Sequence, residues 1–202
     1  IVEMEEDEAA LLADWSHELA ELGLALSEAL KQPVQALWTM QNGYAQCTRA
    51  GLDAITKYLR ALKPERVDAL RGKLCIGIHR DMEVTEAVAD PPPLVSQAFC
   101  SALPVAYSRS VPPPHWEAFG SLVLEAAYEA TMAAAVLNAR RGASNIILLT
   151  ELGAGAFGND PAWVHAAMRR ALKMVTDFDL DVRLVSYLRP SRGLLQLAEE
   201  FG

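Results

Sequence analysis

The feature that most constrains the fold is a short aliphatic run followed at once by a glycine-rich stretch. Asn145–Leu149 has the sequence NIILL, and a continuous β-branched run of this length is typical of an interior parallel strand. Pro161 then begins an amphipathic stretch that reaches about Val175, and proline is favoured at the first position of a helix. The sequence therefore predicts a strand-loop-helix unit of an α/β protein.

The loop inside this unit, Thr150–Pro161, has the sequence TELGAGAFGNDP and carries few bulky side chains. Glycine permits positive φ angles and lets a ligand approach the main chain, while the free N–H groups at a helix start favour an anion. A phosphate or pyrophosphate is the expected ligand. The alternative is a tight turn that needs glycine for its geometry alone. The spacing matches neither the P-loop nor the dinucleotide-binding pattern.

The ten residues Leu152–Pro161, LGAGAFGNDP, resemble the second phosphate-binding loop of macro domains of the poly(ADP-ribose) glycohydrolase-like branch. In that branch a Gly-x-Gly-x-Phe-Gly-Asn run wraps the diphosphate and distal ribose of ADP-ribose. Four further segments are similar, in chain order, to a macro-domain family that includes bacterial effectors which remove ADP-ribose from modified ubiquitin. They are Leu37–Ala45, Leu74–Thr85, Val95–Tyr107 and Leu180–Tyr187. The resemblance implies a three-layer α/β/α sandwich with a mostly parallel central sheet.

The resemblance also implies a set of ligand-binding residues. They are Gly153, Ala154, Gly155, Ala156, Phe157, Gly158, Asn159 and Tyr187. In the family the residue that matches Phe157 covers the distal ribose; packing into the core is the alternative. Asn159 is expected to cap the helix at Pro161, to hydrogen-bond the ligand, or both. Tyr187 follows the last expected strand, where macro domains often place an aromatic ring beside adenine.

Asp81 and Glu83 are the candidate catalytic residues. They follow the expected strand Leu74–His79, in the segment where the family has acids near the scissile ribose bond. A carboxylate there could activate water, because cleavage passes through an oxocarbenium-like state that needs an anion and a base nearby. The alternative is a pair of solvated surface acids.

The preferred function is hydrolysis of an ADP-ribosyl linkage on a modified protein, with ubiquitin as one candidate carrier. The chain departs from the family in lacking an Asn-rich strand end and a Gly-Gly-Gly loop with acidic residues. Two alternatives therefore stay open. One is a non-catalytic reader of ADP-ribose, and the other is a structural half of a larger protein whose core is completed by residues before Ile1.

Composition sets broad limits. With 202 residues and 51% hydrophobic content, the chain is expected to form one macro-domain-like unit, residues 1–202, with a helical extension at 1–36, as the C-terminal part of a longer protein. The formal net charge of −8 argues against nucleic acid or anionic membranes as partners. The three cysteines have no metal-ligand spacing and are expected to be buried thiols, so neither a metal nor a cofactor is expected.

The remaining segments give simpler expectations. Asp7–Leu30 and Gln46–Leu62 have helical apolar spacing, a long Ala-rich helix is expected over 115–140, and Asn42 is expected in a left-handed turn ahead of Gly43. The acidic start IVEMEEDE is the opposite of a signal peptide. The expected location is the cytoplasm, or a host cytosol for a secreted effector.

Overall fold

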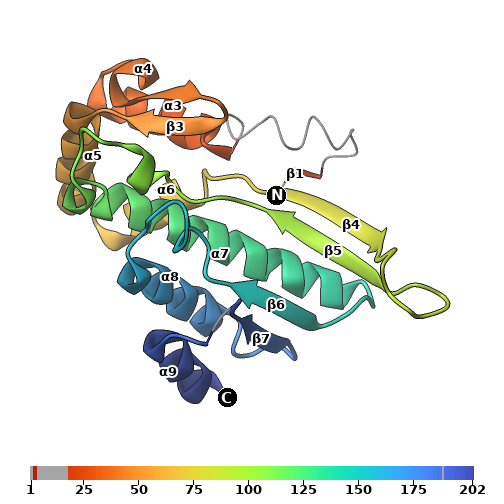
Figure 1. Ribbon diagram of the computed structural model, residues 1–202. Helices are drawn as coiled ribbons and strands as arrows, with labels where there is room; N and C mark the ends of the chain where they lie inside the picture. The colour runs from red at the N-terminus through yellow and green to blue at the C-terminus, as the bar shows by residue number, and fades with distance from the viewer. Residues whose placement is uncertain (1, 4–17, 188) are drawn as a thin grey trace.

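The computed structural model describes residues 2–3, 18–187 and 189–202 (Figure 1). The helices are α3 (Ala20–Leu30), α4 (Val34–Leu37), α5 (Arg49–Ala61), α6 (Pro64–Arg71), α7 (Glu117–Arg140), α8 (Pro161–Met174) and α9 (Arg192–Phe201). The strands are β1 (Val2–Glu3), β2 (Trp38–Gln41), β3 (Tyr44–Cys47), β4 (Gly77–Glu83), β5 (Leu94–Phe99), β6 (Ile146–Thr150) and β7 (Asp181–Val185). Two 3-10 turns, η1 (Val105–Tyr107) and η2 (Pro113–His115), connect β5 to α7.

The strands of the described chain form three small sheets. β4 pairs with β1 in parallel and with β5 in antiparallel orientation, β2 and β3 form a hairpin, and β6 pairs with β7 in parallel. The prediction of a mixed α/β protein is confirmed. The described strands do not form the expected continuous and mostly parallel sheet, because β5 and β6 do not pair with each other.

The predicted strand-loop-helix unit is present as β6, the following loop and α8. α8 begins at Pro161, and the Asp160 carboxylate caps it by accepting a hydrogen bond from the Ala162 N–H at 2.8 Å. β7 then returns parallel to β6. The prediction that β6 is buried on both faces was wrong, because only Ile147 and Leu149 are buried, while Leu148 is 67% exposed.

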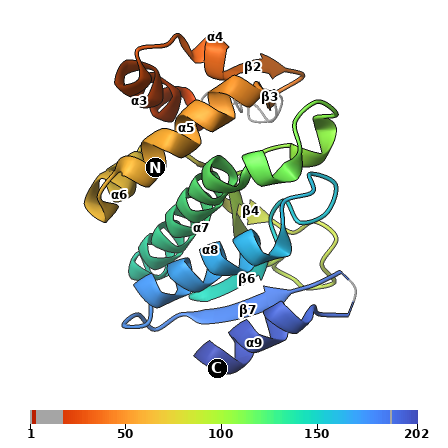
Figure 2. The same ribbon diagram turned by 90° about the vertical axis from the view of Figure 1, so that its left-hand side faces the viewer.

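The long helix α7 separates two hydrophobic clusters, as Figure 2 shows with α5 on one side and α8 on the other. Trp116 and Phe119 belong to the cluster with α3 and α5, and Met132 and Val136 belong to the cluster with β6 and α8. Among the described helices, only α7 has the length and apolar composition of a membrane span. Its place between two clusters accounts for that composition.

Several element boundaries differ from the sequence-based expectations. The helix expected over Asp7–Leu30 is described only as α3, since residues 4–17 lie outside the description. The helix expected from Gln46 begins at Arg49, because Thr48 caps it through the Gly51 N–H. The left-handed prediction for Asn42 is confirmed: its φ is 49° and that of Gly43 is 78°, the positive pair that a two-residue hairpin turn needs.

Candidate functional site

The structural need for glycine differs among the three glycines of the β6–α8 loop. Gly153 and Gly158 have φ angles of +73° and +67°. A Cβ at Gly153 would lie 2.3 Å from the Ala102 Cβ, and one at Gly158 would lie 2.8 Å from the Ala106 Cβ. Turn geometry and packing thus explain both. Gly155 has no positive φ, and a Cβ there would meet nothing within 4 Å. The fold itself does not require glycine at position 155.

Some main-chain N–H groups at the tip of this loop donate no hydrogen bond within the described part of the chain. The Gly158 N–H donates to the Gly155 carbonyl and the Asn159 N–H to the Gly153 carbonyl, each at 3.0 Å. Within the described part of the chain, the N–H groups of Gly155, Ala156 and Phe157 have no acceptor. Gly155 and Ala156 are exposed. Consecutive free N–H groups in a turn can cradle an anion.

Phe157 belongs to a cluster of three aromatic rings. Its ring centroid lies 5.4 Å from that of Tyr44 on β3 and 5.5 Å from that of Tyr107 in η1, and all three pairs meet edge to face. The Phe157 carbonyl also accepts a hydrogen bond from the Ala106 N–H at 2.8 Å. The Phe157 ring therefore packs against other side chains of the protein, as the alternative interpretation expected. Tyr44 of the β2–β3 hairpin supports the loop through this contact. Neither tyrosine is an expected site residue, because the sequence does not show that these segments meet.

Asn159 fixes the loop from inside. The side chain is 1% exposed, and its Nδ2 donates to the Leu103 carbonyl at 2.9 Å and to the Gly153 carbonyl at 3.2 Å. The expectation that Asn159 caps α8 was wrong, because Asp160 holds that position. The Oδ1 atom of Asn159 is buried and has no hydrogen-bond partner among the described residues. Asn159 thus ties the loop to the segment that follows β5.

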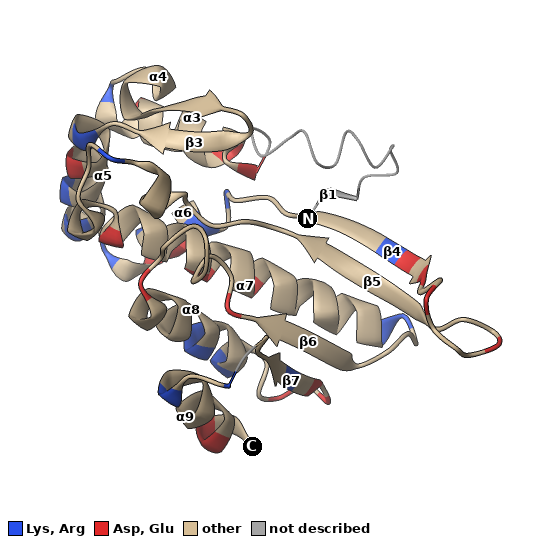
Figure 3. Cartoon of the chain, in the orientation of Figure 1, with Lys and Arg blue, Asp and Glu red and all other residues tan. Residues whose placement is uncertain are grey.

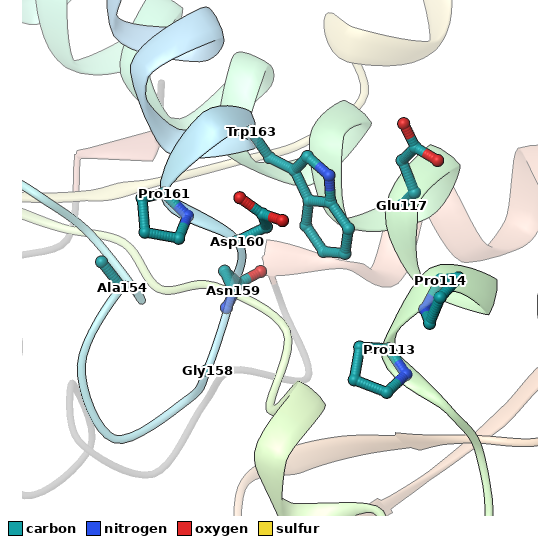
Figure 4. A pocket seen from close by; sticks show the side chains of 9 residues that line it. All are labelled: Pro113, Pro114, Glu117, Ala154, Gly158, Asn159, Asp160, Pro161 and Trp163. Atoms are coloured by element: carbon teal, nitrogen blue, oxygen red, sulfur yellow. The ribbon is translucent and has the colours of Figure 1, made fainter. Parts of the chain in front are cut away.

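A pocket of about 530 Å³ opens beside the start of α8. It is lined by Pro113, Pro114, Glu117, Ala154, Gly158, Asn159, Asp160, Pro161 and Trp163. Figure 4 shows the indole of Trp163 between the carboxylates of Asp160 and Glu117. The lining contains no Lys or Arg, so its polar groups are mainly acceptors and suit a hydrogen-bond donor such as a sugar hydroxyl. Glu117 and Trp163 are further candidate site residues that the sequence patterns do not indicate.

Asp81 and Glu83 do not lie at this loop, so the structure does not bring the expected catalytic residues together with the expected ligand-binding residues. β4 continues to Glu83, so Asp81 sits at a bulge within the strand, with a φ of 55°. Both oxygens of Asp81 bind the Arg141 guanidinium, at 2.7 and 2.5 Å, and this ion pair lowers the pKa of Asp81 below its ordinary value.

The direction of β4 explains the separation. The carboxyl end of β5 leads to Ala102 and Leu103, which contact the loop, and β4 runs antiparallel to β5. The carboxyl end of β4 therefore points away from the loop. Arg141 follows the last turn of α7, whereas Gly120, in its first turns, lies beside Trp163. At 1.5 Å per helical residue, the two ends of α7 are about 35 Å apart.

A different carboxyl group lies near the loop. Burial raises the pKa of Glu18 to about 8, although the facing N–H of Ser101 acts in the opposite direction. Ser101 directly precedes Ala102, which packs against Gly153. The neighbouring thiol of Cys100 is also affected by burial, which raises its pKa to about 11. No sequence signal distinguishes Glu18 from the acids around it, because its burial comes from tertiary packing.

A second polar cluster occupies the carboxyl ends of β6 and β7. Glu151 Oε1 lies 2.6 Å from His165 Nε2, and Ser191 Oγ lies 3.4 Å from the same nitrogen. A catalytic triad needs the acid on the opposite ring nitrogen, and Ser191 Oγ already caps α9 through the Leu194 N–H at 3.1 Å. The cluster therefore fixes α8 and α9 to the end of β6.

Tyr187 is fully exposed just beyond β7. It is therefore not a core residue, and its ring is accessible to a ligand. Among the described residues no group of three or more His, Cys, Asp or Glu side chains could hold a metal ion.

No family model, curated protein or solved structure matches this chain. The functional argument therefore depends on the loop, the pocket beside it and the residues around them.

Proposed function

We propose that this chain is a macro-type domain that binds ADP-ribose, free or attached to a protein, through the loop Gly153–Asn159. The observation that carries the proposal is Gly155. Glycine is required at positions 153 and 158 by the backbone, but a side chain at 155 would meet only open space. Close approach of a ligand to the main chain accounts for glycine at such a position.

The charge distribution supports an anion held by the backbone. No Lys or Arg occurs between Arg141 and Arg169, and in Figure 3 the loop between β6 and α8 carries no blue segment. A diphosphate would therefore be bound by the free N–H groups of Gly155, Ala156 and Phe157 and by the start of α8. The acceptor-lined pocket beside Trp163 suits the ribose hydroxyls, and the exposed Tyr187 offers a surface for adenine.

The position of Asp81 and Glu83 favours a reader over a hydrolase, since neither carboxylate is near the loop. Hydrolysis of an ADP-ribosyl linkage, with modified ubiquitin among the candidate substrates, is the second function we consider. It is favoured by one observation. The exposed carboxylate of Glu117 lines the pocket and has no ion-pair partner among the described residues.

Calorimetry with ADP-ribose tests the proposal directly. Wild type should bind, and Gly155→Val should bind at least tenfold more weakly, because the new side chain covers the free N–H groups. The control is Ala89→Val, which places the same valine side chain at an exposed position in the connection between β4 and β5, distant from the loop. Circular dichroism should show both variants folded. Equal affinities for Gly155→Val and wild type would remove the loop as the site.

A release assay separates the two functions. Wild type and Glu117→Gln are incubated with ADP-ribosylated ubiquitin and with other ADP-ribosylated proteins, and free ADP-ribose is measured. A reader releases none. Release by wild type that falls in Glu117→Gln would instead establish the hydrolase.

A further inference from the structure

The pocket beside the start of α8 brings together two carboxylates and no positive charge. Asp160 and Glu117 both line it, and the lining contains no Lys or Arg. One oxygen of Asp160 accepts the capping hydrogen bond from the Ala162 N–H, and its other oxygen has no partner among the described residues. Each carboxylate lies at a helix start, where a negative charge is favourable. The helix starts account for each acid singly, but not for the pocket that the two acids share.

Trp163 provides an aromatic surface between these carboxylates (Figure 4). Its six-membered ring packs against α7 at Gly120, where a Cβ would lie 3.5 Å from the ring. The side chain also lines the pocket and is only partly buried. Aromatic faces attract cations, and tryptophan attracts them most strongly. The pocket therefore combines two negative charges with the kind of surface that an organic cation prefers.

The buried side chain of Asn159 adds an independent observation. Its Nδ2 donates to the carbonyls of Leu103 and Gly153, which fixes the amide so that Oδ1 faces the other way. Figure 4 shows this oxygen on the side of Trp163, and a Cβ at Gly120 would lie 3.6 Å from it. The oxygen is buried without a hydrogen-bond partner among the described residues. An unpaired buried acceptor costs free energy, and its partial negative charge adds to that of the carboxylates in the pocket.

The mouth of the pocket is accessible to another molecule. The exposed residues of its lining include Pro113, Pro114, Glu117, Asp160 and Pro161. The proline rings offer apolar surface, which suits the methylene stem of a long basic side chain whose charged head contacts the carboxylates. The volume of about 530 Å³ is within the range of about 300–1,000 Å³ that is usual for ligand pockets, so such a head and its stem fit inside.

We propose that this pocket binds the charged head of a basic side chain, the guanidinium of an arginine or the ammonium of a lysine, on a bound protein. The head lies against Trp163 and between Asp160 and Glu117, and its stem contacts the prolines of the mouth. The formal net charge of −8 favours the approach of a basic protein surface. This inference goes beyond the binding of ADP-ribose, whose ribose would take the part of the pocket at Ala154 and Gly158.

The test follows the indole N–H signals of the ¹⁵N-labelled full chain by NMR. The chain has four tryptophans, and Trp163→Phe assigns the signal of Trp163. The probes are peptides Gly-Gly-X-Gly-Gly with blocked ends, in which X is arginine, lysine or citrulline, the uncharged analogue of arginine. The arginine and lysine peptides should shift the Trp163 signal and leave that of the buried Trp116 unchanged. The citrulline peptide should bind at least about tenfold more weakly than the arginine peptide, because it lacks the charge.

A variant that neutralises both acids tests their part in binding. Glu117→Gln combined with Asp160→Asn should weaken binding of the charged peptides at least about tenfold, because both charge-assisted hydrogen bonds become neutral ones. Asparagine caps a helix as well as aspartate does, so α8 should keep its start. The control is Glu86→Gln, which neutralises an exposed acid in the connection between β4 and β5 and should leave the affinities unchanged.

Several results would overturn the proposal. A Trp163 signal that neither charged peptide shifts would exclude the pocket as a cation site, and equal binding of the citrulline peptide would show that charge is not recognised. Affinities unchanged in the double variant would exclude the carboxylates. Agmatine carries the same guanidinium without a peptide, and if it binds about tenfold more tightly than the arginine peptide, the ligand is a free small cation and not a protein side chain. The test uses no nucleotide, so its failure is separate from failure to bind ADP-ribose.

Discussion

Glu18 gives a quantitative prediction about stability. Its carboxyl is partly buried beside Ser101, and burial raises its pKa from the ordinary 4.5 to about 8. Between these two pH values the folded chain holds a proton that the unfolded chain has released. Stability should therefore fall as pH rises from about 4.5 to about 8, and this contribution should level off above 8.

The size of the effect follows from the same shift. The difference between 4.5 and about 8 corresponds to at most about 5 kcal/mol, at 1.36 kcal/mol for each pH unit. Partial exposure of the carboxyl reduces this, and we expect about 2–3 kcal/mol. Glu18→Gln keeps the shape but cannot ionise, so the variant should become more stable than wild type by that amount as pH rises to 8.5.

The assay is urea unfolding of wild type and Glu18→Gln at intervals from pH 5 to 8.5. Glu28→Gln is the control, because it removes an exposed carboxylate from α3, the helix that begins two residues after Glu18. The difference between wild type and Glu28→Gln should stay flat. If the difference between wild type and Glu18→Gln is also independent of pH, Glu18 is ionised in the folded protein and the argument from burial fails.

Three further substitutions test particular contacts. Gly153→Ala should lower the free energy of unfolding by about 2–4 kcal/mol, because φ is +73° and the new Cβ would collide with Ala102; Gly155→Ala, measured alongside by urea unfolding, should cost far less. Arg71→Met should lower the free energy of unfolding by about 3 kcal/mol, since the buried guanidinium binds Glu125 at 2.6 Å. An unchanged free energy of unfolding would show that the ion pair only offsets its own desolvation. Tyr187→Ala should leave the melting temperature unchanged, because the ring is fully exposed, and should weaken ADP-ribose binding several-fold by calorimetry; unchanged affinity would exclude the ring from the site.

Local chemistry made part of this structure predictable. The β6–α8 unit follows from an aliphatic run, a glycine-rich loop and a proline at the helix start, all within about 30 residues. The hairpin turn at Asn42 and Gly43 likewise depends on the conformational preferences of two residues. These features need no knowledge of what lies on the other side of the molecule.

The positions of the acids were not predictable in this way. Asp81 was expected at a strand end near the ligand, but the strand continues through a bulge and runs away from the loop. Glu18 lies in an acidic stretch, and only tertiary packing places it against Ser101. Tyr44 supports Phe157 across more than a hundred residues of sequence. Strand direction and long-range packing decide these cases, and neither is encoded in local periodicity.

The length of α7 also separates charges at one end of the molecule from the glycine loop at the other. The Asp81–Arg141 pair lies about 35 Å from the helix start, several times the screening length of about 8 Å at physiological salt. Charges added or removed there cannot alter the field at the glycine loop. The exposed residues around this pair therefore offer an attachment point for a fluorescent label or a surface tether that leaves the ligand site undisturbed.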